Sequence, residues 1–127
     1  MREFAEKLRV VEKEMSSEKG SFLLFALFLC EDAADSWDLL VSAQWLEADK
    51  SAGLKYLATK VQSAGTAAEL VKLSRIVIIG RDQPMLAAIQ SAVCVEHGFS
   101  EISRNNFNGL RIDHAYIITS RRELTPV

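Results

Sequence analysis

Side chains that could bind an anion lie where an apolar run of the chain ends. The β-branched run Ile76–Ile79 is followed directly by Gly80, Arg81 and Asp82, with Pro84 two positions further on. This order predicts a buried strand, a glycine turn and a helix whose first amide groups face the turn. Helix N-termini favour anions, and arginine is a bidentate donor to phosphate or carboxylate. We therefore interpret Gly80, Arg81 and Asp82 as candidate ligand-binding residues.

The same residues also fit a plain strand-to-helix turn. In that interpretation Gly80 supplies backbone freedom, Asp82 caps the helix and Arg81 is solvated. The chain has neither the G-x-G-x-x-G nor the G-x-x-x-x-G-K-[ST] pattern, so the known dinucleotide and P-loop signatures are absent. The sequence favours the plain turn and leaves the anion site open.

Two further candidates follow another predicted strand, Trp37–Ala43. Ser42 and Gln44 lie at its carboxyl end, and Trp45 comes next. If this strand runs parallel to the one at 75–80, both polar side chains approach Gly80 and Arg81 across the sheet edge. The pattern then predicts a small pocket with Trp45 as its apolar wall.

Acidic residues gather around a predicted turn. Two or three converging carboxylates can hold Mg²⁺ or Mn²⁺ and serve a hydrolase. Acidic residues in a turn are more often solvated turn formers. Asp38 differs from the others because it falls inside a strand, so it is the candidate metal ligand, although nothing in the sequence requires a cofactor. The group consists of Glu31, Asp32, Asp35 and Asp38.

The histidines and cysteines match no catalytic or zinc-binding pattern. His97 and His114 have neither a Ser-His-Asp nor a Cys-His partner at a specific spacing, and paired zinc-ligand spacing is absent. Cys30 and Cys94 have apolar neighbours in the sequence, so we expect both to be reduced core residues. Whether the chain is an enzyme stays open.

The first half of the chain predicts one helix followed by a strand pair. Apolar residues spaced by three and four positions from Phe4 to Met15 mark one face of a helix, and Glu12 falls among the charged residues expected to be solvated. Residues 21–30 predict a strand that is apolar on both faces and therefore central. The short connection to Trp37–Ala43 favours antiparallel pairing.

The second half predicts two helices, a central strand, another helix and a hairpin. A helix over 50–63 is followed by the capping-box spacing of Thr66 and Glu69, which begins a short helix. The strand over 75–80 is expected at the centre of the sheet, and a helix follows it. Asn108-Gly109 predicts the turn between strands near 99–106 and 110–119, with a frayed tail over 120–127.

This element order, α-β-β-α-α-β-α-β-β, predicts an α/β fold. Its five strands form a mixed sheet, packed with helices in a two- or three-layer sandwich. A chain of 127 residues with 49% hydrophobic and 25% charged residues is typical of one globular domain, here 1–127. Whether Arg121 and Arg122 end at the same pole as Arg81 depends on strand directions that the sequence does not give.

The composition of the chain argues against two classes of binding partner, nucleic acids and membranes. A net charge of −2 argues against sequence-independent binding of nucleic acid. The apolar run from Phe22 to Cys30 is too short to cross a bilayer. We expect a cytoplasmic protein without a membrane partner.

The absence of an assembled catalytic constellation favours a non-catalytic module that binds a protein partner or forms a homodimer. The alternative is a domain that binds a phosphate, a nucleotide or another small anionic ligand, or a metal-assisted hydrolase. Its site would lie at the carboxyl ends of strands 37–43 and 75–80.

Overall fold

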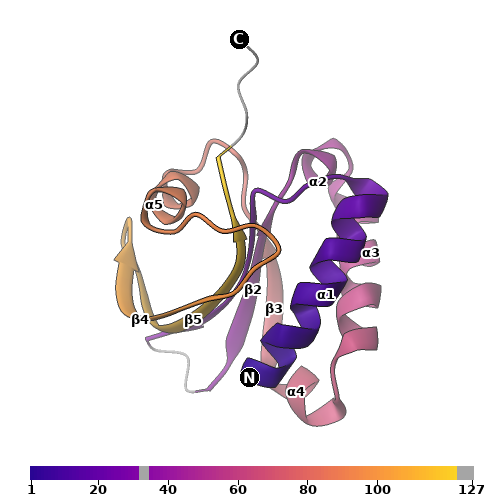
Figure 1. Cartoon of the computed structure of the whole chain (residues 1–127), viewed down its shortest axis with the longest axis horizontal. Coiled ribbons are helices and arrows are strands. Elements are labelled where there is room, and N and C mark those ends of the chain that lie inside the picture. Colours follow the sequence, from indigo (N-terminus) through magenta and orange to yellow (C-terminus); the bar gives the residue numbers. More distant parts are fainter. Residues whose placement is uncertain (32–34, 123–127) are drawn as a thin grey trace.

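The computed structural model, which describes residues 1–31 and 35–122, has five helices and a five-stranded mixed sheet, an α/β fold (Figure 1). The strands lie in the order β3-β2-β1-β5-β4, and only β2 and β3 are parallel. No helix among the described residues is both long and apolar enough to span a bilayer. The elements are α1 (Arg2–Lys19), β1 (Leu24–Cys30), β2 (Trp37–Ser42), α2 (Gln44–Ala48), α3 (Lys50–Ala64), α4 (Ala67–Lys72), β3 (Leu73–Ile78), α5 (Pro84–Ala92), β4 (Ser100–Phe107) and β5 (Leu110–Ser120).

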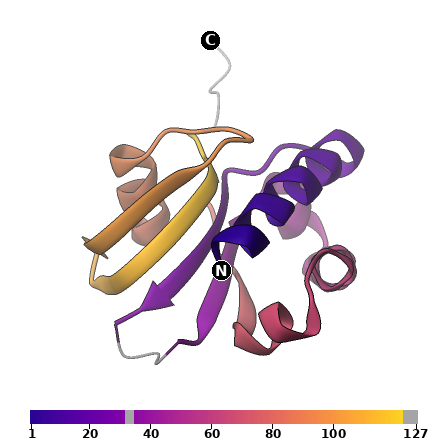
Figure 2. The same ribbon diagram turned by 60° about the horizontal axis from the view of Figure 1, so that its bottom comes forward.

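Helices cover both faces of the sheet, which makes three layers (Figures 1 and 2). Helices α1, α2 and α3 pack on one face, over a cluster that includes Phe25 and Leu27 of β1. Helix α5 packs on the other face, over a cluster that includes Leu24, Ala26 and Phe28. Alternate residues of β1 thus enter opposite cores, and the predicted central position of this strand is confirmed.

The strand predicted at 75–80 lies elsewhere than expected. It is observed as β3, at one edge of the sheet, where it pairs only with β2. Most of its residues are half-buried or exposed. The prediction of a central strand was wrong because a β-branched run also fits an edge strand that packs under helices on one face.

Of the remaining local predictions, some are confirmed and others are wrong. The hairpin turn is confirmed, with positive φ at Asn108 (53°) and Gly109 (94°). Helix α2 was missed, because five residues are too few to show a periodicity. Strand β5 continues through the buried Ser120, so the tail predicted over 120–127 starts later than expected. Residues 123–127 of that tail lie outside the described residues. Cys94 is exposed rather than in the core.

Glu12 of α1 is fully buried, which corrects the expectation that it is solvated. Its carboxylate accepts three hydrogen bonds, from Nδ1 of His97 (2.6 Å), Oγ1 of Thr119 (3.0 Å) and Oγ of Ser16 (3.1 Å). The Thr119 hydroxyl in turn accepts from the backbone N–H of His97 (3.1 Å). A buried carboxylate is tolerated only when its oxygens are satisfied in this way.

These bonds join segments that are far apart in the chain. Glu12 and Ser16 belong to α1, Thr119 to β5, and His97 to the connection between α5 and β4, where its φ is 51°. Arg9 adds a fourth contact, from its Nε to the His97 carbonyl (3.1 Å). The Glu12 network therefore fixes helix α1 against the end of β5 and the loop beside it.

Replacing Glu12 with alanine should lower the free energy of unfolding by about 3–5 kcal/mol, because His97 and Thr119 would lose their buried acceptor. Urea denaturation measures the loss. Glu14→Ala, an exposed change on the same helix, is the matched control and should shift stability by less than about 0.5 kcal/mol. Equal effects of the two changes would show that the network does not hold α1 in place.

Candidate functional site

Three strands end at the same edge of the sheet. Strand β1 runs antiparallel to both β2 and β5, and Leu24 at its start pairs with Ser42 and with Ser120. Strand β3 is parallel to β2 and ends beside it, with Ile78 opposite Val41. The carboxyl ends of β2, β3 and β5 therefore share one edge, which also places Arg121 there.

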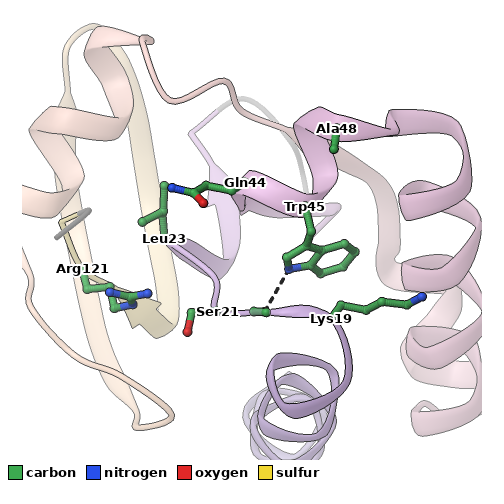
Figure 3. A pocket seen from close by; sticks show the side chains of 8 residues that line it. Lys19, Ser21, Leu23, Gln44, Trp45, Ala48 and Arg121 are labelled. Carbon is green, nitrogen blue, oxygen red and sulfur yellow. Dashed lines mark hydrogen bonds between the residues drawn. The ribbon is translucent and has the colours of Figure 1, made fainter. Parts of the chain in front are cut away.

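A recess of roughly 600 Å³ opens at this edge (Figure 3). It lies between the end of α1, the start of β1, helix α2 and the residue after β5. The chain thus brings three segments that are distant in sequence, 19–23, 44–48 and Arg121, to one hollow. The lining residues are Lys19, Gly20, Ser21, Leu23, Gln44, Trp45, Ala48 and Arg121.

Trp45 forms one wall of the recess, and its ring is held in place. The indole N–H donates to the Gly20 carbonyl (2.9 Å), as the dashed line in Figure 3 shows. Phe22 and Tyr56 make edge-on ring contacts with the indole, at centroid distances of 5.4 and 6.0 Å. A ring fixed in this way presents a preformed apolar surface, since it has little freedom to lose on binding.

Arg121 lies across the recess from Trp45 (Figure 3). Its backbone is anchored twice, because its N–H donates to the Leu23 carbonyl (3.0 Å) and its carbonyl accepts from Nε2 of Gln90 (2.7 Å). Its Nε is 2.8 Å from Oε2 of Glu96, an ion-pair distance. That buried Nε nevertheless has no hydrogen-bond acceptor among the described residues, because the N–H does not point along the contact.

The charged residues that line the recess are both cations. Lys19 and Arg121 contribute positive charge, and no aspartate or glutamate of the described residues belongs to the lining. The Lys19 ammonium lies over the Tyr56 ring, 5.1 Å from its centroid. Its positive charge is therefore at the rim of the recess rather than inside it. The lining itself is therefore positively charged, although Glu96, outside the lining, partly offsets the charge of Arg121.

The structure separates the predicted ligand-binding residues into two places. Gln44 lines the recess beside Trp45, whereas Gly80 and Asp82 line a second hollow of roughly 530 Å³ beyond α2. Ser42 is fully buried and lines neither; its hydroxyl has no hydrogen-bond partner among residues 1–31 and 35–122. The parallel pairing of β2 and β3 brings these segments to one edge, and the short helix α2 stands between the two hollows.

The donors of Arg81 are already engaged by a carboxylate. Its backbone N–H donates to Oε1 of Glu47 (2.8 Å) and its Nε to Oε2 of the same residue (2.6 Å). These donors lower the pKa of Glu47, the backbone N–H contributing most and the guanidinium next. A phosphate at this turn would have to displace Glu47. The Glu47–Arg81 pair instead links helix α2 to the loop after β3.

Asp38, the candidate metal ligand, forms a cross-strand ion pair. Its Oδ1 is 3.3 Å from Nε of Arg75, and 13% of its side chain is exposed. Asp35 contacts Lys72 at 3.5 Å, and Asp32 lies outside the described residues. Within the part of the chain that the structure describes, no three histidine, cysteine or acidic side chains gather as metal ligands would.

The sequence singled out Gln44 and Trp45, which both line the recess, but none of the residues on its opposite side. Lys19 ends a helix, Ser21 lies in a connection and Leu23 precedes a strand, so none belongs to a local motif. Arg121 was considered only as a neighbour of Arg81. No protein-family model, curated protein or solved structure matches the chain, so the site stands on its geometry alone.

The Glu47–Arg81 pair predicts a stability term that depends on pH. Because the folded-state pKa of Glu47 is lowered, its stabilisation is complete above the unfolded-state pKa and is lost as the pH falls through the folded-state pKa. Glu47→Gln should therefore cost about 0.5–1 kcal/mol at pH 7 and less at pH 3. Chemical denaturation at both values measures the difference.

Arg81→Gln is the companion variant. It removes the guanidinium but keeps the backbone N–H, the larger cause of the shift, so it should retain most of the pH dependence that Glu47→Gln abolishes. If both variants flatten the pH profile equally, the guanidinium rather than the backbone holds the carboxylate.

Proposed function

We propose that this chain is a binding domain for a small anionic ligand, with its site in the recess between Arg121 and Trp45. The single observation that supports this most is the state of Arg121. Its backbone is fixed from both sides, and its buried Nε–H has no aligned acceptor among the described residues. The Nε contact with Glu96 (2.8 Å) is not a well-aligned hydrogen bond, so an anion that aligned with the guanidinium and displaced Glu96 would improve on it.

The lining suggests the chemistry of the ligand. A guanidinium recognises the two oxygens of a carboxylate or phosphate in a planar, bidentate manner. The Trp45 indole on the opposite side offers a flat apolar surface on which a ring could pack. A hollow of roughly 600 Å³ is within the range of small-molecule sites. We therefore propose a carboxylate or a phosphate that carries a planar ring, such as a nucleoside monophosphate.

The rim supports the same ligand class. Lys19 adds a second positive charge at the end of α1, and the Gln44 amide supplies a neutral polar group beside Leu23 (Figure 3). Attraction of an anion by the rim would raise its association rate and would weaken with added salt. Binding of this kind needs no chemical step.

Titration with AMP, phenyl phosphate and benzoate tests the proposal, with adenosine as the uncharged comparison. We expect the anions to bind and to quench the fluorescence of Trp45, which Trp45→Phe would abolish. Arg121→Gln should weaken AMP binding by about 10–100-fold, since it removes a charge-assisted contact of about 1.5–3 kcal/mol. Calorimetry measures both dissociation constants.

Arg122→Gln is the matched control. It removes the same charge one residue later, from a side chain that contacts Ser91 (2.9 Å) and does not line the recess. Its AMP affinity should stay within about twofold of the unmodified chain. Equal affinity of the two variants, or equal binding of adenosine and AMP, would count against the recess as an anion site.

A further inference from the structure

Strand β3 presents an open edge of backbone donors and acceptors. It pairs only with β2, and the bond from Ile79 N–H to the Val41 carbonyl (2.8 Å) sets which groups face that partner. From Arg75 onward, odd-numbered residues direct their backbone groups toward β2, so those of Ile76 and Ile78 point away from it; Ser74 lies at a register shift of the pairing. No other strand among the described residues pairs with these groups.

The other edge of the sheet is protected, and β3 is not. Strand β4 carries a run of four exposed polar residues, and one of them, Arg104, has a φ of 44°, outside the extended region. Charged side chains and irregular backbone are the usual devices against edge pairing. Strand β3 has regular pairing from Arg75 onward, and three of its last four residues are apolar: Ile76, Val77 and Ile78.

An apolar groove runs along the helix side of this edge. It measures roughly 380 Å³, and its lining includes Val61, Leu70, Leu73, Ser74 and Ile76. Val71 of the neighbouring helix α4 is 85% exposed. A strand added at this edge would have its alternate side chains directed into the groove.

We infer that β3 pairs antiparallel with β3 of a second copy of the chain, about a two-fold axis at Ile76. In this register Ile76 faces its own counterpart, and Ser74 faces Ile78 of the second copy. Ile76 and Ile78 have outward backbone groups, so the two Ile76 residues form a hydrogen-bonded pair at the axis and Ile78 presents its N–H and carbonyl to the second copy. The two sheets then join into one continuous sheet, a closed and symmetric contact.

The side chains of β3 fit this symmetric pairing. The short Ser74 leaves room beside the groove for Ile78 of the second copy, and that apolar side chain fills it. Arg75, the charged residue of the strand, faces Val77 and is already paired with Asp38 on its own sheet (3.3 Å). No like charges are opposed, and no unpaired charge is buried. A second copy therefore suits the edge better than a partner that brings its own charges.

Sedimentation velocity over a hundredfold range of concentration tests the inference. The contact involves one short strand and its flanking helices, at the low end of interface size, so we expect a reversible, concentration-dependent dimer. Ile78→Pro removes one outward N–H and leaves the bond from the Ile79 N–H to Val41 in place, so it should weaken the dimer at least tenfold. A circular dichroism spectrum like that of the unmodified chain and a cooperative urea transition show that this variant folds.

Cysteine cross-linking tests the register, in a Cys30→Ser, Cys94→Ser background and with oxidised glutathione as oxidant. Ile76→Cys places two thiols across the axis, in a pair whose Cα separation suits a disulfide, and should give a covalent dimer. Ser74→Cys, at a residue far from its own counterpart in this register, is the matched control and should stay monomeric on a non-reducing gel.

The named outcomes separate the possibilities. A dimer that is lost in Ile78→Pro and cross-linked through Ile76→Cys supports the inference. A strictly monomeric chain overturns it, as does a dimer unaffected by Ile78→Pro. Cross-linking through Ser74→Cys but not Ile76→Cys would overturn the proposed register. None of these outcomes depends on ligand binding at Arg121, so the two proposals stand or fall separately.

Discussion

The position of β1 at the centre of the sheet determines most of what this molecule can do. Its residues are buried on both faces and its two neighbours both run antiparallel to it. For that reason β2 and β5 must end at the same edge, and β3 follows because it is parallel to β2. The recess, Arg121 and the loop after β3 all lie at this edge as a consequence of strand direction. If either β2 or β5 ran parallel to β1, Arg121 and Gln44 would lie at opposite ends of the sheet.

The buried Glu12 network fixes the remaining wall of the recess. Apolar packing is non-directional, and the other polar contacts of helix α1 with the sheet, such as Arg2–Glu101, lie at the surface. The buried hydrogen bonds from His97 and Thr119 to the Glu12 carboxylate therefore add a directional constraint on where α1 lies. The end of that helix leads directly into Lys19, Gly20 and Ser21, so the same bonds position the rim of the recess and the carbonyl that holds the Trp45 indole.

The two proposed surfaces use different parts of the sheet. Ligand binding uses the end of β2 and β5, and self-association uses the side of β3, with helix α2 and the Glu47–Arg81 pair between them. Each surface has a polar group whose hydrogen-bonding capacity is left unused within the described chain: Nε of Arg121 in one case and the outward backbone groups of β3 in the other. At both surfaces the same physical rule applies: polar groups that are buried, or that lie among apolar side chains, need hydrogen-bond partners.

The sequence by itself determined the elements whose signals are local. Helix periodicity gave α1, the capping residues gave α4 and Asn108-Gly109 gave the hairpin turn, because each depends on neighbours within a few positions. The α/β class and the central place of β1 followed from apolar patterning. Tertiary structure decided the edge position of β3, the burial of Glu12 and the lining of the recess. These depend on which strands pair and which helices cover them, and a β-branched run or a glutamate on a helix has the same local pattern in either environment. Arg121 became part of a site only because two antiparallel pairings brought the end of β5 beside Leu23 and Gln44.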